Sequence, residues 1–151
     1  MICITGTPGT GKSTLCLNLN RNAATCRSAN DEAQRLDCVS GDVVDIGRLR
    51  AAINGVSIIE GHYTHLLDCE CAIILTASEE TIRKRLLDRG YSREKVEENI
   101  GAMLSDSIYY EALDRLPAGR IFKVSTDGEN EGAVLARVME IISLVRGNNK
   151  S

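Results

Sequence analysis

The chain has 151 residues, which is the size of one ordinary domain with a hydrophobic core of its own. Its net charge of -3 at pH 7 argues against a protein that coats nucleic acid by general electrostatics, and no apolar run approaches the roughly 18 residues that would suggest a membrane span. The first residues predict a strand instead of a basic leader, so we expect a cytoplasmic protein.

The first predicted elements flank a phosphate-binding motif. Apolar residues 1–5 predict a strand, residues 6–13 read Gly-Thr-Pro-Gly-Thr-Gly-Lys-Ser, and residues 12–22 predict a helix. This stretch fits the pattern G-x-x-x-x-G-K-[ST] in the strand, loop and helix context that the motif requires. The glycines would let backbone N–H groups surround a phosphate, Lys12 would reach the β- and γ-phosphates, and Ser13 would hold Mg²⁺. We therefore expect a bound nucleoside triphosphate here.

The next region carries weaker signals. Residues 24–26 are a candidate for a short second strand. A helix should follow through residue 36, with Ser28, Asn30 or Asp31 as its N-terminal cap, and residues 37–41 predict a loop.

Two apolar strands follow. Asp45 caps a predicted helix that Gly55 ends, and residues 56–60 then form an apolar strand that finishes on Glu60. Residues 71–75 form another unbroken apolar run. Such runs are typical of a parallel sheet that is covered on both faces.

The second half of the chain predicts three helices and one strand. Thr76 or Ser78 caps a helix that breaks at Gly90, and Ser92 caps a long helix that continues until Pro117. Residues 120–125 predict a fifth strand, a last helix closes the fold, and residues 147–151 should fray.

Alternating strands and helices predict an α/β fold in three layers, with a doubly wound, five-stranded parallel sheet of the P-loop NTPase type. We expect a single domain over residues 1–146. Ligands of such sheets bind beyond the carboxyl ends of the strands, where Gly6, Glu60 and Thr76 must all emerge. Polar residues that follow these strand ends are therefore candidates for the site.

Glu60 and His62 are two such candidates. An acid at the end of this strand is suited to orienting Mg²⁺, although a carboxylate at a strand end can also be simply solvated. His62 follows two residues later and gains weight from its position beside the phosphates. His65 has no assigned role, and two histidines do not make a zinc site without a third ligand.

Arg85 and Arg89 are spaced i, i+4 and share one face of their predicted helix. Guanidinium groups near the strand ends can clamp a transferring phosphoryl group, whose charge spreads over its equatorial oxygens. The alternative is a solvated basic helix face. Because only Gly90 and Tyr91 separate this helix from the next, the chain has no room for a large lid, and we expect some ATP hydrolysis without an acceptor.

Six cysteines are present without a pair of C-x-x-C motifs. This spacing favours buried free thiols that pack as small hydrophobic side chains over a metal or disulfide role. The six are Cys3, Cys16, Cys26, Cys38, Cys69 and Cys71.

These motifs together resemble a known family. The P-loop at residues 6–13, the acid-x-His motif at Glu60 and His62, and the run Arg-Leu-Leu-Asp-Arg-Gly-Tyr-Ser-Arg-Glu-Lys at residues 85–95 are similar to those of the atypical adenylate kinases of archaea and eukaryotes, which also act as ribosome assembly factors. The resemblance spans the chain and is carried by residues 1–19, 58–67 and 75–110.

The resemblance implies phosphoryl transfer from ATP, with Mg²⁺, to a nucleoside monophosphate, chiefly AMP, together with ATPase activity. It also implies a role in maturing small-subunit ribosomal RNA through a small-subunit ribosomal protein and pre-rRNA. One alternative is an ATPase assembly factor with little metabolic kinase role, and another is a kinase acting on a different small hydroxyl acceptor. Matched residue by residue, the ATP loop comprises Gly9, Gly11, Lys12, Ser13 and Thr14, and Arg89 is the ATP-contacting arginine of the short lid.

The chain departs from the family pattern at two places. Glu60 stands where relatives usually have Asp, and the monophosphate-binding insertion, at about residues 23–45, is short; the lid lies at about residues 88–98. The basic residue expected on the second helix aligns to Gln34 or, with a shift of one, to Arg35. The acceptor site is thus the part of the function that the sequence defines least.

Overall fold

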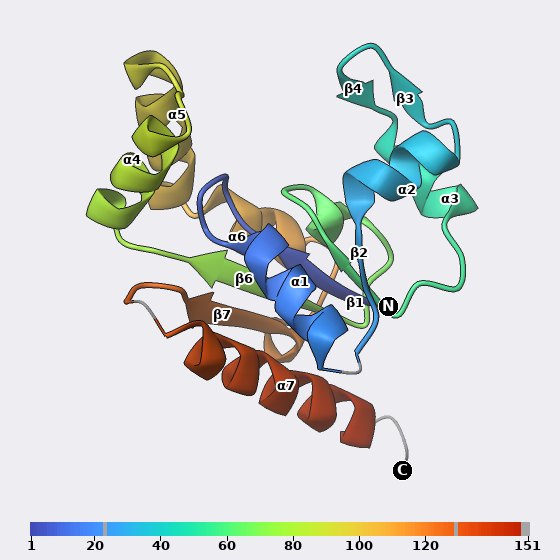
Figure 1. Ribbon diagram of the computed structural model, residues 1–151. Helices are drawn as coiled ribbons and strands as arrows, with labels where there is room; N and C mark the ends of the chain where they lie inside the picture. The colour runs from blue at the N-terminus through green and yellow to red at the C-terminus, as the bar shows by residue number, and fades with distance from the viewer. Residues whose placement is uncertain (23, 129, 149–151) are drawn as a thin grey trace.

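The computed structural model describes residues 1–22, 24–128 and 130–148, and a five-stranded sheet lies at its centre (Figure 1). The strand order is β2-β5-β1-β6-β7, and every neighbouring pair is parallel, as the apolar runs predict. The strands are β1 (Ile2–Thr5), β2 (Cys26–Ser28), β5 (Ile58–Glu60), β6 (Cys71–Thr76) and β7 (Ile121–Ser125). Parallel pairing places their carboxyl ends along one edge, where the site forms.

Helices cover both faces of the sheet, which confirms the predicted α/β class. On one face the main core cluster joins the sheet to α1 and α7 through Leu15, Leu19, Val138 and Ile141. On the other face Ala112 of α6 packs with Ile74 and Ile121 of the sheet. The helices are α1 (Lys12–Arg21), α2 (Ala29–Arg35), α3 (Ile46–Ala52), α4 (Glu79–Asp88), α5 (Arg93–Leu104), α6 (Ser107–Leu113) and α7 (Glu131–Asn148), with 3₁₀ turns at Thr64–Leu66 and Ala118–Arg120.

Side-chain caps fix where several helices begin. Ser28, Asp45, Ser78 and Ser92 each accept a hydrogen bond from the backbone N–H three residues later. Ser28 and Ser78 therefore hold the cap positions for which the sequence left alternatives open. In Figure 1 the α4–α5 pair and the α2–α3 segment extend to opposite sides beyond the carboxyl edge of the sheet.

The predicted long helix after Ser92 is divided in two. It ends at Leu104 and resumes at Ser107, because Asp106 adopts a left-handed conformation with φ of 57°. The Asp106 carboxylate binds Lys123 Nζ at 2.6 Å, which anchors the turn to β7. The break lets α6 turn back onto the sheet, where Ala112 is fully buried.

Two further boundaries differ from the predictions. The second strand lies at Cys26–Ser28 instead of residues 24–26. Val39 and Ser40 of the predicted loop form strand β3 (Val39–Ser40), which pairs with β4 (Val43–Val44), just beyond that loop, in a small antiparallel hairpin. Of the tail expected to fray, Gly147 and Asn148 are helical, and residues 149–151 lie outside the described residues.

The prediction that the cysteines are free thiols was wrong for four of the six. Disulfides join Cys3 to Cys69 and Cys16 to Cys26. The sheet and the α1–β2 connection bring these pairs within reach from 66 and 10 residues apart, which spacing alone did not reveal. Cys38 and Cys71 are buried free thiols, and burial raises the pKa of Cys71 to about 11.

No helix within the described ranges is long and apolar enough to cross a bilayer. The same residues contain no group of three or more His, Cys, Asp or Glu side chains placed to hold a metal ion by themselves. The cytoplasmic location stays a prediction.

Candidate functional site

The loop between β1 and α1 has the shape of a phosphate cradle. Gly6, Gly9 and Gly11 have φ of 152°, 87° and 92°. A Cβ at Gly6 would lie 2.8 Å from the Leu75 carbonyl oxygen, and one at Gly9 would lie 3.2 Å from the Leu86 side chain. The close backbone oxygen thus leaves no room for a side chain at Gly6, and the left-handed backbone favours glycine at Gly9.

Lys12, at the start of α1, folds back over this loop. Its Nζ donates to the carbonyl oxygens of Gly6 at 2.8 Å and Thr7 at 2.9 Å. Burial lowers the pKa of Lys12 to about 8; the Glu60 carboxylate opposes this shift and the Arg89 guanidinium adds to it. At pH 7 the ammonium is therefore still charged and available to an anion.

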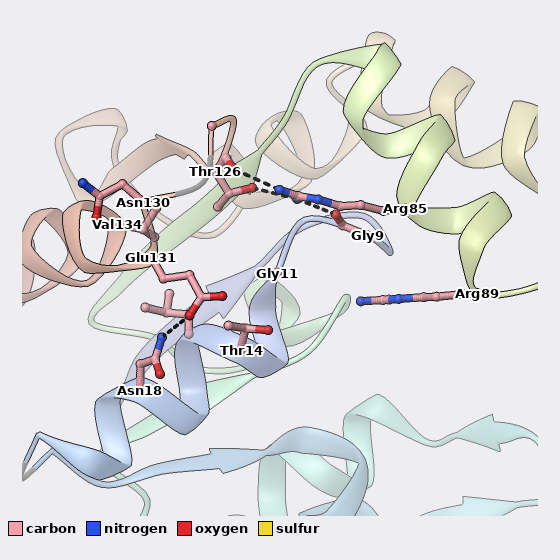
Figure 2. Close-up of a pocket in the computed structure, with 12 residues that line it drawn as sticks. Gly9, Gly11, Thr14, Asn18, Arg85, Arg89, Thr126, Asn130, Glu131 and Val134 are labelled. Atoms are coloured by element: carbon pink, nitrogen blue, oxygen red, sulfur yellow. Dashed lines mark hydrogen bonds between the residues drawn. The ribbon is translucent and has the colours of Figure 1, made fainter.

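Two pockets are lined by Gly9 and Gly11 of this loop, and the larger of these two, here called the large pocket, has a volume of about 420 Å³ (Figure 2). It opens between α1, α4 and the segment that joins β7 to α7. Its lining combines a few apolar side chains with hydrogen-bonding groups, which suits a nucleoside. The lining residues are Gly9, Gly11, Thr14, Leu15, Asn18, Arg85, Arg89, Thr126, Gly128, Asn130, Glu131 and Val134.

Arg85 ties three elements together at the rim of the large pocket (Figure 2). Its Nη1 donates to the Gly9 carbonyl at 2.9 Å and to Thr126 Oγ1 at 3.2 Å, and its Nη2 donates to the Thr126 carbonyl at 3.0 Å. The sequence paired Arg85 with Arg89 as a clamp for the phosphoryl group. In the structure the Arg85 guanidinium hydrogen-bonds the P-loop and the residue after β7, and the clamp role stays a prediction.

Several lining residues were not among the predicted ones. Thr126 donates from Oγ1 to the Thr10 carbonyl at 2.8 Å, and Asn18 Nδ2 donates to Glu131 Oε2 at 3.3 Å. Thr126 directly follows β7, so the rule that ligands bind at strand ends could have found it. Asn18 and Glu131 lie on separate helices, and no sequence signal joins them.

The second pocket, here called the central pocket, has a volume of about 260 Å³. It lies where the P-loop faces the ends of β2 and β5. Gly9, Gly11 and Arg89 line both pockets, so the two adjoin. Its lining residues are Pro8, Gly9, Gly11, Lys12, Ser13, Ser28, Asn30, Glu60, Gly61, His62, Arg89 and Tyr91.

Glu60 ends β5 inside this pocket, as the sequence predicts, and is 8% exposed. Burial raises the pKa of Glu60, with Lys12 acting in the opposite direction and Asp31 adding to the shift. Ser13, Asp31 and Glu60 together line a groove between α1 and α2. A hydroxyl and two carboxylates form an all-oxygen donor set, which fits Mg²⁺ bound partly through water.

The two histidines have different surroundings. His62 lines the central pocket, and burial lowers its pKa, with Lys12 adding to the shift, so the imidazole is neutral at pH 7. His65 is 2% exposed and hydrogen-bonds through Nδ1 to Thr5 Oγ1 at 2.9 Å. Its Nε2 lies 3.4 Å from Glu111 Oε1. His65 thus joins β1 to α6 and does not enter the pocket lining.

The two basic-residue candidates on α2 do not reach the central pocket. Arg35 donates from Nε and Nη2 to Glu32 Oε2, at 3.2 and 2.6 Å. Neither Gln34 nor Arg35 lines the pocket. The sheet, the P-loop and the two adjoining pockets nevertheless define a P-loop nucleotide-binding protein.

Comparison with known proteins agrees with this class. A family model described as an AAA domain matches residues 2–104. A protein of Thermoplasma acidophilum named "Putative adenylate kinase" is 45% identical over 99% of both chains, and one of Archaeoglobus fulgidus with the same name is 32% identical over 100% of this chain and 85% of its own. The chain belongs to the AAA-domain family and to the family of these archaeal proteins.

Solved structures share the fold at low sequence identity. Shikimate kinase from Acinetobacter baumannii, in complex with shikimate, is 16% identical with a TM-score of 0.63, over 97% of this chain and 93% of its own. The protein TT1252 from Thermus thermophilus is 18% identical with a TM-score of 0.58, over 93% and 94% of the two chains. The fold is therefore that of P-loop kinases.

Proposed function

We propose that the protein transfers the γ-phosphoryl group of ATP to a nucleoside monophosphate, with AMP as the preferred acceptor. The observation that carries this proposal is the meeting of the two pockets at the P-loop, with Arg89 in the lining of both. A nucleoside in the large pocket would direct its phosphates along the loop toward Lys12. The central pocket would then hold the acceptor opposite the terminal phosphate. The names of the archaeal relatives support the same reaction.

Each proposed catalytic group has a role that follows from its position. Lys12 and Arg89 would neutralise charge that develops on the transferred group, and no covalent intermediate is needed. Ser13 and Glu60 would hold Mg²⁺, which when bound neutralises phosphate charge. The neutral His62 would offer a hydrogen bond beside the acceptor. Arg85 would act by holding the Gly9 and Thr126 backbones in place.

We further propose that the protein hydrolyses ATP when no acceptor is bound. Only residues 89–92 separate α4 from α5, so the connection is too short to form a large covering lid. Water would therefore reach the terminal phosphate more readily than under a large lid.

An assay of ADP and phosphate release tests both statements. Purified protein with ATP and Mg²⁺ is incubated with AMP, CMP, GMP or UMP, and without acceptor, beside a Lys12→Ala control. We expect ADP formation to be fastest with AMP and a slower phosphate release without acceptor. ADP that never exceeds the hydrolysis rate with any monophosphate would contradict the kinase activity. Phosphate release equal to that of the Lys12→Ala control would contradict the ATPase activity.

A role in maturing small-subunit ribosomal RNA stays a prediction from the family resemblance. The net charge of -3 favours a basic protein partner, such as a small-subunit ribosomal protein, over naked RNA. In that role ATP hydrolysis would control binding to this protein partner instead of supplying ADP.

A further inference from the structure

The wall of the central pocket that faces the P-loop carries no lysine or arginine. This wall consists of Ser28, Asn30, Glu60, Gly61 and His62, which come from β2, α2, the end of β5 and the segment after it. The two cations of the pocket, Lys12 and Arg89, come from the P-loop and the end of α4. On this wall, only neutral groups can therefore add to those cations in binding an acceptor phosphate.

The arginines of β2 and α2 are both engaged with one buried carboxylate. Glu32 has a side chain that is 4% exposed, and it accepts hydrogen bonds from Arg35 and, at 3.1 Å, from Arg27 Nη1. Arg35 and Arg27 lower the pKa of Glu32, so it stays ionised and keeps both guanidinium groups. Neither arginine lines the central pocket.

Asn30 is held in one orientation by a buried tyrosine. Tyr63 is 6% exposed, belongs to the core cluster with Ala29 and Leu49, and donates from its hydroxyl to Asn30 Oδ1 at 2.9 Å. Since Oδ1 accepts this bond, the amide nitrogen Nδ2 must point the other way. Within the described residues, Nδ2 has no protein acceptor, so both of its N–H groups are available to a ligand.

We infer that Asn30 Nδ2 donates to a phosphate oxygen of the nucleoside monophosphate acceptor, and that Tyr63 is the residue that positions this amide. The inference rests on the proposed function and names the group that serves in place of a basic residue on α2. Burial and the neighbouring Glu60 carboxylate raise the pKa of Tyr63 to about 12. The hydroxyl therefore remains a donor across the neutral and mildly alkaline range.

Titration of AMP by calorimetry tests the role of Asn30 directly. Asn30→Asp keeps the shape but replaces the amide donor with a negative charge, so we expect AMP to bind at least about 10-fold more weakly. The matched control is Asn54→Asp, which adds the same charge at an exposed site before β5, at the far end of that strand. Equal AMP affinity in the wild type and Asn30→Asp would overturn the inference.

A double-mutant cycle tests the role of Tyr63. Tyr63→Phe should weaken AMP binding by about 3- to 10-fold in the wild type and should have no further effect in an Asn30→Ala background. A purely structural role for Tyr63 would weaken binding equally in both backgrounds and would contradict the inference. Tyr110→Phe is the control, because that ring is 62% exposed on α6.

The binding readout also separates this inference from the proposed function. AMP binding that depends on Asn30, without ADP formation, would contradict the kinase activity and leave the inference intact. ADP formation with an unchanged KM for AMP in Asn30→Asp would contradict the inference and leave the kinase activity intact. Absence of AMP binding to the wild type would overturn the inference.

Discussion

Lys12 makes nucleotide binding sensitive to pH. Its pKa of about 8 reflects a cost of burying the ammonium, and bound phosphates would raise that pKa because they favour the charged form. Binding above pH 8 must therefore include proton uptake. We expect ATP affinity to fall about 10-fold between pH 7 and pH 9.

Calorimetry in two buffers with different heats of ionisation measures this proton uptake. At pH 8.5 the apparent enthalpy of ATP binding should depend on the buffer, and at pH 6.5 it should not. The Lys12→Met variant should bind ATP weakly and without this dependence. An ATP affinity that stays constant from pH 7 to pH 9 in the wild type would contradict the assignment.

Individual residues also show how far the sequence defines the site. Gly9, Lys12, Ser13, Glu60 and Arg89 lie together as predicted, because a local motif and strand-end positions determine them. The bonding of Arg85 could not be predicted, since its partners Gly9 and Thr126 lie 76 and 41 residues away. The sequence offers Asn30 only as a candidate helix cap, because its contact with Tyr63 depends on tertiary packing.

At the scale of elements, α4 is coupled to the P-loop by Arg85 and by packing of Leu86 near Gly9. Arg85→Met should lower the free energy of unfolding by about 1–3 kcal/mol and weaken ATP binding, because hydrogen bonds of a charged group are lost. Arg89→Met should leave stability nearly unchanged and lower kcat by about 10²- to 10³-fold. Thermal unfolding and steady-state kinetics of the two variants distinguish the structural role of Arg85 from the catalytic role of Arg89.

Arg83→Met provides a control on the same helix. Arg83 makes exposed ion pairs with Glu79 and Glu97, so its loss should change stability by less than about 1 kcal/mol and leave ATP binding intact. If Arg85→Met lowered kcat as strongly as Arg89→Met without affecting stability, the clamp role predicted from the sequence would apply to both arginines.

The sequence predicts the starts of helices correctly where a local capping residue is present. Ser28, Asp45, Ser78 and Ser92 each cap the helix that follows, since a cap acts on its nearest neighbours. The break at Asp106 was missed because its cause is tertiary: the ion pair with Lys123 and the burial of Ala112 outweigh the continuous helical pattern.

The two disulfides act on the molecule as a whole. Cys3–Cys69 closes a loop of 66 residues and Cys16–Cys26 one of 10, so in the chain-entropy account they contribute about 4 and about 3 kcal/mol to stability. We expect a reductant to lower the melting temperature of the wild type. The pair Cys3→Ala and Cys69→Ala should cost more stability than the pair Cys16→Ala and Cys26→Ala.

A variant that carries all four alanines serves as the reference for this experiment. Its melting temperature should not respond to the reductant, which separates loss of the bridges from any effect of the reagent. Thiol titration before and after reduction shows whether both disulfides have been opened. If they have, and the melting temperature of the wild type is unchanged, a stabilising role would be contradicted.

The central position of β1 has a consequence for synthesis of the chain. Ile2 pairs with Ile58 on one side and with Cys71 on the other, so both neighbours of the P-loop strand come much later in the sequence. The nascent P-loop leaves the ribosome before either neighbour exists, and closing such long loops is slow compared with forming a helix. The newly made chain should therefore acquire nucleotide affinity late, and ATP would stabilise the completed fold instead of its early intermediates.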